Sequence, residues 1–174
     1  MTATEQNGDG EPPVSSPDGR QSQSAAEIAR GTQRMLARHG CASLAELPLP
    51  NGRRADLIAL SQKGEIWIIE IKSSIEDFRT DLKWPEYREY CDRLLFAVKP
   101  EFPSEILPGE TGLILADRYS GEVVREAPEH KLAGGRRKSM MLLFARAAAF
   151  RLTLTLDPPL AQIIGQTLKK SGEV

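Results

Sequence analysis

The 174-residue sequence has only two cysteines and two histidines. Cys41 and Cys91 lack CxxC spacing, which is typical of reduced thiols in a cytosol rather than of a disulfide framework. With only His39 and His130 available, the sequence disfavours a histidine-based metal site and a Ser-His-Asp triad. We expect both histidines to lie at the surface.

Long apolar runs are also missing. No run approaches the ~18 apolar residues of a membrane span, and the first residues contain no apolar signal segment. Export and membrane insertion are therefore not supported, and we expect a cytoplasmic protein. The composition, 40% hydrophobic and 27% charged, is typical of a globular domain with its own core.

The chain has no strong excess of charge of either sign. Its net charge is −1, but residues 1–24 contain four acidic residues and one basic residue. The remaining 150 residues therefore carry 22 Lys and Arg against 20 Asp and Glu, a charge of +2. This balance is too weak by itself to indicate a nucleic-acid partner, so the positions of the charges must decide.

The sequence divides into three parts. Residues 1–24 are rich in Gly, Pro, Ser and polar residues and predict a disordered tail. Residues 25–150 form the folded domain, and residues 151–174 form a C-terminal extension. A helix is expected over residues 24–40, with Ser24 as N-cap, Glu27 completing a capping box and Gly40 as its end.

Hydrophobic patterning predicts the elements of the domain. The strands are expected at residues 41–49, 53–62, 66–74, 93–99 and 111–126, the last bending at Ser120–Gly121. The helical segments are expected at residues 74–92, interrupted at Pro85, and at 138–150, followed by a strand-like stretch at 151–156 and a short terminal helix. Lys63–Gly64 favours a hairpin between the second and third strands. The order predicts an α/β fold in which helices flank a central sheet.

Two charged residues interrupt the apolar segment IWIIEIKSS, residues 66–74. Side chains alternate between the faces of a strand, so Glu70 and Lys72 share one face and the apolar residues between them share the other. A carboxylate and an ammonium group at the end of a buried strand point either to a site or to a weak surface ion pair. The E-x-K spacing alone does not separate these alternatives.

An upstream aspartate favours a site. Asp56 precedes Glu70 in a D-x13-E-x-K pattern, and a hairpin would bring both carboxylates together. Two carboxylates form an oxygen-rich site suited to Mg²⁺ or Mn²⁺, with the backbone carbonyl of Ile71 as a further ligand. Such a metal activates water and stabilises charge on a phosphate oxygen. Lys72 could hold the attacking water and stabilise the developing negative charge.

These motifs carry a family resemblance. The run RRADLIAL…IWIIEIKSSIEDFRTDLKWPEYREYCDRLLFAV resembles the MmcB-like family of bacterial DNA repair proteins, within the PD-(D/E)xK nuclease superfamily. The resemblance covers roughly residues 25–150. It implies a restriction-endonuclease-like fold with a central mixed sheet, divalent-metal chemistry and a DNA substrate.

Site residues follow from the resemblance by position. Asp56 and Glu70 would be metal ligands and Lys72 the catalytic lysine. Ala55 stands where the superfamily pattern has proline, a departure that does not touch the chemistry. Glu27 is an additional acid in this interpretation, as an alternative to its capping role.

The segment after the site is a first candidate for DNA contact. Lys83 and Arg88 could meet phosphates, and Trp84 and Tyr87 could stack on bases. The alternative is an amphipathic helix whose aromatic residues pack on the sheet. We expect Asp77 and Asp81 on a solvated face or in a cap, and Tyr90 and Cys91 in the core.

The basic cluster KLAGGRRKS, residues 131–139, is a second candidate. Arg136, Arg137 and Lys138 follow two glycines that indicate a flexible loop. Cations at a helix N-terminus oppose the macrodipole, so helix stability does not explain them. Contact with phosphate is one explanation, and a solvated loop is the other.

The sequence thus predicts a Mg²⁺- or Mn²⁺-dependent endonuclease acting on DNA in repair, with DNA and DNA repair proteins as partners. A DNA-binding repair module that keeps the nuclease fold but cleaves little is the alternative. A protein unrelated to DNA, with an ordinary hairpin, is a third.

Overall fold

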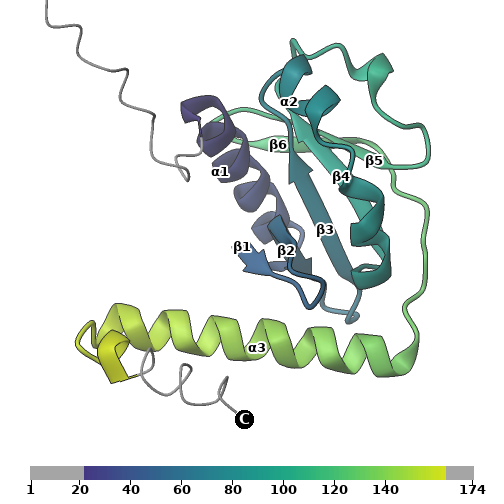
Figure 1. The fold of residues 1–174 in the computed structure, drawn as a ribbon. Coiled ribbons are helices and arrows are strands. Elements are labelled where there is room, and N and C mark those ends of the chain that lie inside the picture. The colour runs from purple at the N-terminus through teal and green to yellow at the C-terminus, as the bar shows by residue number, and fades with distance from the viewer. Residues whose placement is uncertain (1–21, 164–174) are drawn as a thin grey trace, which may run out of the picture.

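A six-stranded mixed sheet forms the centre of the protein in the computed structural model, which describes residues 22–163 (Figure 1). Helices lie on both sides of this sheet and across one end of it. In chain order the elements are α1 (Gln23–Arg38), β1 (Ala42–Pro48), β2 (Arg54–Leu60), β3 (Ile66–Ile71), α2 (Ile75–Thr80), the 3-10 helix η1 (Trp84–Tyr90), β4 (Arg93–Val98), the 3-10 helix η2 (Ser104–Ile106), β5 (Gly112–Ala116), β6 (Gly121–Arg125) and α3 (Gly134–Leu156).

The strands lie in sequence order, β1 to β6. β1, β2 and β3 are antiparallel, β3, β4 and β5 are parallel, and β6 is antiparallel to β5. The segment predicted as one strand bent at Ser120–Gly121 thus forms two strands. The predicted α/β class is confirmed, and the arrangement is consistent with a restriction-endonuclease-like fold.

The predicted β2–β3 hairpin is also present. Leu60 pairs with Ile66, and the turn between them contains Gly64 at a φ of 80°, where a side chain would be strained. This hairpin places the ends of β2 and β3 that carry Asp56 and Glu70 next to each other.

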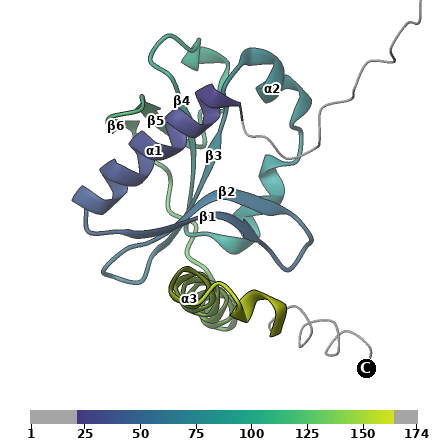
Figure 2. The same cartoon turned by 90° about the vertical axis from the view of Figure 1, so that its left-hand side faces the viewer.

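The two faces of the sheet are covered by different helices. On one face, Ile69 and Ile71 of β3 pack in a cluster with Ile28 and Leu36 of α1. On the other face, β3 residues pack against Tyr87 and Tyr90 of η1. Figure 2 shows α1 and the α2–η1 segment on opposite sides of the sheet. The expected core positions of Tyr90 and Cys91 are confirmed.

The first helix begins earlier than expected. Ser22, not Ser24, is the N-cap, and its hydroxyl accepts from the N–H of Ala25 at 3.1 Å. The capping box at Glu27 is therefore wrong. The Glu27 carboxylate instead forms an ion pair with Lys99 at 3.1 Å, which ties α1 to the end of β4.

The helical segment after β3 consists of two pieces. The α-helix α2 ends at Thr80, and the 3-10 helix η1 begins at Trp84. Pro85 lies in the first turn of η1, where its missing N–H costs no hydrogen bond. The interruption therefore comes before the proline, at residues 81–83.

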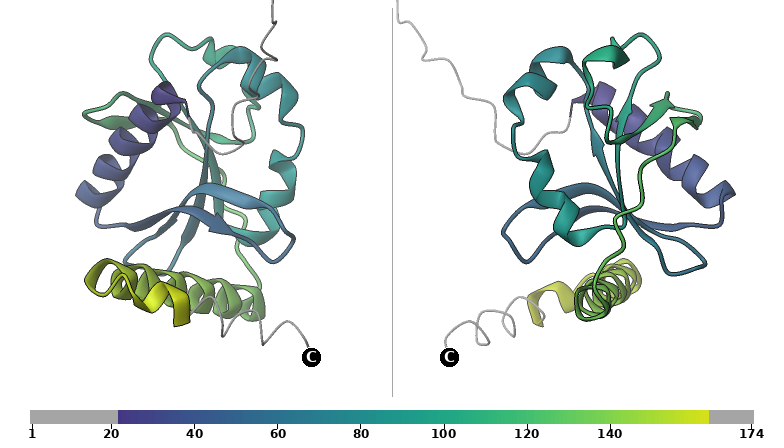
Figure 3. Two further views of the ribbon diagram at one scale, coloured as in Figure 1. Left: turned by 60° about the vertical axis from the view of Figure 1, so that its left-hand side comes forward. Right: turned by 90° about the vertical axis from the view of Figure 1, so that its right-hand side faces the viewer.

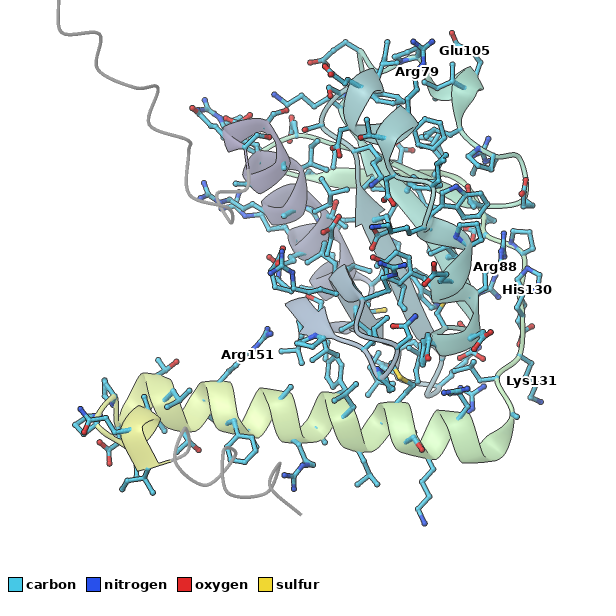
Figure 4. All side chains as sticks on the ribbon, in the orientation of Figure 1. Arg79, Arg88, Glu105, His130, Lys131 and Arg151 are labelled. Atoms are coloured by element: carbon cyan, nitrogen blue, oxygen red, sulfur yellow. The ribbon has the colours of Figure 1, made fainter. Side chains whose placement is uncertain are left out.

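The helix α3 is longer than expected at both ends. It begins at Gly134 and so includes Arg136, Arg137 and Lys138, which do not lie in a flexible loop. It continues through residues 151–156, which are not a strand. Arg151 helps to hold residues 151–156 in the helix, since its guanidinium donates to the carbonyls of Ala45 and Glu46 (Figure 4). A helical turn follows at residues 160–163. The rest of the predicted terminal helix and residues 1–21 of the predicted tail lie outside the described residues.

Length and composition alone would let α3 cross a membrane, and within residues 22–163 it alone passes that test. Only 6% of its most apolar window is buried. The helix crosses the end of the sheet opposite α2, as both views in Figure 3 show. Met140 and Phe144 pack it against the domain core.

Candidate active site

A pocket of about 400 Å³ lies at the end of β3, between the start of α1 and the helix α2. The three residues singled out by the D-x13-E-x-K pattern all line it. The full lining is Ser22, Ala25, Asp56, Glu70, Ile71, Lys72, Ser73, Asp77, Asp81 and Tyr87. The hairpin thus brings Asp56, Glu70 and Lys72 together as the pattern predicts.

The two carboxylates bond the backbone of each other's strands. The N–H of Ile71 donates to Asp56 Oδ2 at 2.8 Å, and the N–H of Asp56 donates to Glu70 Oε1 at 3.4 Å. The β2–β3 register ends one residue earlier, at Leu57 and Ile69. Side-chain oxygens therefore replace the strand pairing here, and this opens the end of the hairpin into a pocket.

The neighbouring strand β1 is irregular at the same level. Its register passes from Ala45↔Leu57 to Leu47↔Ala55, so Glu46 and Asp56 are skipped. Glu46 has a φ of 53°, a conformation that favours glycine. The carbonyl of Glu46 accepts from Arg151, so α3 helps to hold this irregularity. The sheet is consequently loosened on both sides of Asp56.

Lys72 is buried next to both acids. It follows β3 directly, and its N–H continues the pairing with β4 by donating to the carbonyl of Ala97 at 3.0 Å. Its Nζ lies 3.9 Å from Glu70 Oε2 and 2.5 Å from Asp81 Oδ2. Glu70 and Lys72 are 3% and 4% exposed, so this is not a solvated surface pair.

Burial and crowding disturb the two carboxylates. Burial, with smaller contributions from neighbouring acids, raises the pKa of Asp56 from 3.8 to about 6. Burial and the Asp56 carboxylate raise the pKa of Glu70 well above its usual value. Both carboxyl groups therefore resist ionisation. A cation bound between them would stabilise their charged forms.

Lys72 and Asp81 behave in the opposite way. Burial lowers the pKa of Lys72, but the hydrogen bond to Asp81 and the charge of Glu70 outweigh it and the net shift is upward. For Asp81, burial raises the pKa and the Lys72 hydrogen bond outweighs it, so the net shift is downward. Lys72 therefore stays protonated, which suits charge stabilisation and not proton abstraction.

The donor set fits a hard divalent cation. Glu70 receives one long hydrogen bond, so its carboxylate keeps free acceptor capacity in a buried place. Mg²⁺ is commonly held by one or two carboxylates and several waters, and Asp56 and Glu70 supply the two. Among residues 22–163 no group of three or more His, Cys, Asp or Glu side chains is arranged to hold a metal. Glu27, the expected additional acid, is paired with Lys99.

Asp81, which the sequence interpretation placed on a solvated face or in a cap, is the C-cap residue of α2 and also a site residue. It is half-buried and bonds Lys72 directly. Asp77 also lines the pocket, where its carboxylate accepts from the N–H of Ser73 at 3.0 Å. Their position in the sequence was the available signal, since Asp77 lies in the short helix that follows the E-x-K pair and Asp81 ends that helix.

The aromatic residues after the site pack on the sheet. Tyr87 is buried and its hydroxyl donates to the carbonyl of Arg54 at 3.1 Å. Trp84 contacts Phe96 edge to face, with 5.8 Å between ring centroids. Of the two alternatives for these aromatic residues, packing on the sheet is the one that the structure shows. Tyr87 is buried and cannot stack on bases.

The two cations of this segment differ. Arg88 donates to the carbonyl of Glu110 at 2.6 Å and lies over the Trp84 ring, so it is a packing residue. Lys83 is exposed and follows Asp81 closely. The N–H of Lys83 donates to Asp81 at 3.1 Å, so Lys83 is an exposed cation next to a residue that lines the pocket.

The basic cluster lies at the other end of the sheet. Arg137 donates two hydrogen bonds to the buried Asp92, at 2.8 and 2.6 Å, and one to the carbonyl of Gly64 in the β2–β3 turn. Arg136 lies over the Tyr90 ring, 4.7 Å from its centroid. Lys138 is exposed. Since Gly64 and Glu70 are at opposite ends of β3, this cluster is remote from the acids.

The sequence interpretation did not single out a row of arginines on α1. Arg30, Arg34 and Arg38 recur every four residues and are exposed on one side of the helix whose first turn lines the pocket. Arg34 donates to the carbonyls of Arg118 and Tyr119, and Arg38 donates to the Ser120 hydroxyl. Their spacing of four residues in the sequence could have indicated that they share one side of the helix.

A protein-family model for MmcB-like DNA repair proteins matches residues 12–159. The chain belongs to the MmcB-like family. This confirms the resemblance inferred from the hairpin motif and assigns the protein to DNA repair, with DNA as the partner that the family suggests. No curated protein matches the chain.

One solved structure is similar over most of the chain. It is a protein of unknown function from Silicibacter pomeroyi, with a TM-score of 0.76 and 50% sequence identity. The match covers 79% of this chain and 94% of that one. The similarity supports the fold of this MmcB-like protein and leaves its activity to be argued from the site.

Proposed function

We propose that this MmcB-like protein is a metal-dependent deoxyribonuclease that hydrolyses phosphodiester bonds during DNA repair. The observation that carries the proposal is the convergence of Asp56, Glu70 and Lys72 in one pocket at the open end of a hairpin. A buried lysine held protonated beside two under-satisfied carboxylates is an arrangement suited to phosphate chemistry.

Each residue has a distinct task in this proposal. Asp56 and Glu70, with the Ile71 carbonyl, would hold Mg²⁺ or Mn²⁺, which when bound supplies an activated water and neutralises phosphate charge. Lys72 stabilises the negative charge that develops on the phosphate oxygens. Asp81 positions the Lys72 ammonium group and keeps its pKa high.

DNA would reach the pocket along α1. A helix rises about 1.5 Å per residue, so Arg30 lies ~7.5 Å and Arg38 ~20 Å along the axis from Ala25 at the pocket. Cations at this spacing meet successive phosphates without reading bases. Lys83, next to the pocket residue Asp81, would add a further exposed cation.

Cleavage is tested with purified protein on single-stranded, duplex, flapped and branched DNA in Mg²⁺, Mn²⁺ or EDTA. We expect cutting with either metal and none in EDTA. Glu70→Gln should abolish both cutting and the Mn²⁺ signal in calorimetry, whereas Lys72→Met should abolish cutting and keep most of the metal affinity. Wild-type activity in both variants would show that the pocket is not the site.

The DNA path is tested separately by binding. Replacing Arg30, Arg34 and Arg38 with Ala should weaken DNA affinity and reduce the slope of log affinity against log salt by about 2–3. The matched control replaces Arg136 and Lys138, at the remote end, and should leave the slope unchanged. If the slope fell only in the variant lacking Arg136 and Lys138, DNA would bind at the start of α3 and not along α1.

A DNA-binding module with little cleavage is the second candidate. It is favoured by the burial of Glu70 and by the ion pair that already occupies Lys72. In that case wild-type protein would bind DNA with the same α1 dependence and cut no substrate with any metal.

A further inference from the structure

The helix α3 carries a second apolar face, turned away from the domain. Its inner face packs on the sheet through Met140 and Phe144. A helix that is apolar all round is normally buried on all sides, yet α3 is covered on one side only. Its outer face therefore calls for a partner.

The outer residues have the spacing of a helix-packing seam. We define the outer seam as Leu142, Ala145, Ala149, Leu152 and Leu156, which are separated alternately by three and four residues. All five are exposed, and the leucines are 54%, 60% and 76% exposed in chain order. Alternation of three and four is the pattern by which apolar residues of one helix pack against another helix.

We propose that α3 pairs in antiparallel orientation with α3 of a second copy of this chain, through the outer seam. The seam is self-complementary when a two-fold axis passes beside Ala149. Leu142 then meets the second copy's Leu156, and Ala145 meets its Leu152. Ala149 meets its own equivalent, and small residues at the centre let the helix axes approach closely.

Charge favours the antiparallel orientation. α3 contains no acidic residue, and Lys138 lies on the same side as the outer seam, four residues before Leu142. In a parallel pair the two Lys138 side chains would face each other. In the antiparallel pair Lys138 lies near the second copy's helix C-terminus and Asp157, both of which attract a cation.

A membrane surface fits this helix less well. Helices that lie in a membrane interface have one strongly polar face, whereas α3 carries large apolar residues on both its inner and its outer side. Two of its arginines are bound to the domain: Arg137 to Asp92 and Arg151 to the Ala45 and Glu46 carbonyls. The side opposite the seam is occupied by these contacts.

The first test measures the mass of the full chain in solution by light scattering over a concentration series. We expect about twice the 19.2 kDa chain mass for wild type. Leu152→Glu should halve it. Thr155→Glu also introduces a glutamate, within one turn of Leu152 but about 100° around the helix from the seam, and should leave the mass at twice that of the chain. Near-ultraviolet circular dichroism checks that both variants keep the fold.

Cysteine cross-linking tests orientation. Ala149→Cys should form a cross-linked dimer, and Leu142→Cys alone should not, because its equivalents would lie ~21 Å apart along the axis. The double variant Leu142→Cys with Leu156→Cys should cross-link again. Cross-linking of Leu142→Cys alone would mean a parallel pair and would overturn the proposal.

Two other outcomes also overturn it. A wild-type chain that stays monomeric, or one whose mass does not respond to Leu152→Glu, would show that the seam does not join two copies. A monomer that binds vesicles of acidic phospholipid, and loses that binding with Leu152→Glu, would assign the seam to a membrane surface instead.

Discussion

The ammonium group of Lys72 donates a hydrogen bond to Asp81 at 2.5 Å, while the nearest Glu70 oxygen is 3.9 Å away. The lysine is therefore held from the side of α2 and not by its neighbour in the E-x-K motif. Its charge and its position both depend on a residue nine places further along the chain.

Asp81→Asn tests this dependence. Because the Asp81 hydrogen bond helps to raise the pKa of Lys72, its loss should lower that pKa. The alkaline limit of DNA cleavage should then move to lower pH, and maximal activity should fall about 10- to 100-fold. The measurement is a pH–rate profile in Mn²⁺. Asp77→Asn, which removes another carboxylate from the same pocket, is the control and should leave the alkaline limit within a few tenths of a pH unit.

Asp56→Asn should stabilise the metal-free protein, and increasingly so at higher pH. The pKa of Asp56 is raised from 3.8 to about 6 in the fold, so its contribution is fully present below pH 3.8 and is lost as the pH rises through about 6. The gain over wild type should therefore be small near pH 4 and reach a plateau above pH 6, on the order of 1–3 kcal/mol.

Thermal melts in EDTA across this pH range measure that gain. Glu101→Gln, at an exposed carboxylate, should show no such trend. Added Mn²⁺ should raise the melting temperature of wild type and not of Asp56→Asn, since binding to the folded state stabilises it. A gain that shrinks with rising pH would contradict the proposed crowding.

Arg137→Ala should destabilise the fold and leave DNA binding intact. Asp92 is fully buried and would lose two hydrogen bonds while keeping those from the N–H groups of Ile66 and Leu132. We expect a loss of about 1–3 kcal/mol in urea unfolding at neutral pH. The pKa of Asp92 is lowered in the fold, because the Arg137 and backbone hydrogen bonds outweigh burial, so variant and wild type should converge below pH 4.

Arg136→Ala is the matched control for that experiment. Arg136 is exposed and its pairing with Glu89 is long, at 3.8 Å. Its loss should change stability by less than about 1 kcal/mol. Equal effects of the two substitutions would mean that the Asp92 pairing does not hold α3 in place.

Gly31→Ala should destabilise the packing of α1 on the β5–β6 turn. A Cβ at this position would lie 1.9 Å from the carbonyl oxygen of Asp117 and 2.4 Å from that of Ser120. Backbone atoms cannot move aside easily, so we expect a loss of about 1–3 kcal/mol. Gly109→Ala, where a Cβ would meet nothing within 4 Å, is the control in the same unfolding series.

The sequence predicted what depends on neighbouring positions in the chain. Strand alternation and the Lys63–Gly64 turn were enough to place Asp56, Glu70 and Lys72 together. Contacts between distant segments were not accessible in the same way. The partner of Arg137 is Asp92, and nothing local marks either residue as half of a buried pair.

At the end of α3, the local sequence pattern gave a wrong prediction. The stretch RLTLTL alternates like a strand, and its threonines favour strands locally. It remains helical because Arg151 reaches the β1 backbone and the preceding turns already run along the sheet. Tertiary contact outweighed local propensity there.

The bond from the Ile71 amide to Asp56 turns one backbone proton into a reporter on the pocket. That proton is sheltered by a carboxylate instead of by a strand partner, so its exchange with solvent deuterium follows the state of the side chain. Loading the pocket with metal, protonating Asp56 or replacing it would each leave a different exchange rate at Ile71, while the amide of Ile69, in the last regular pair of the ladder, would serve as the internal reference.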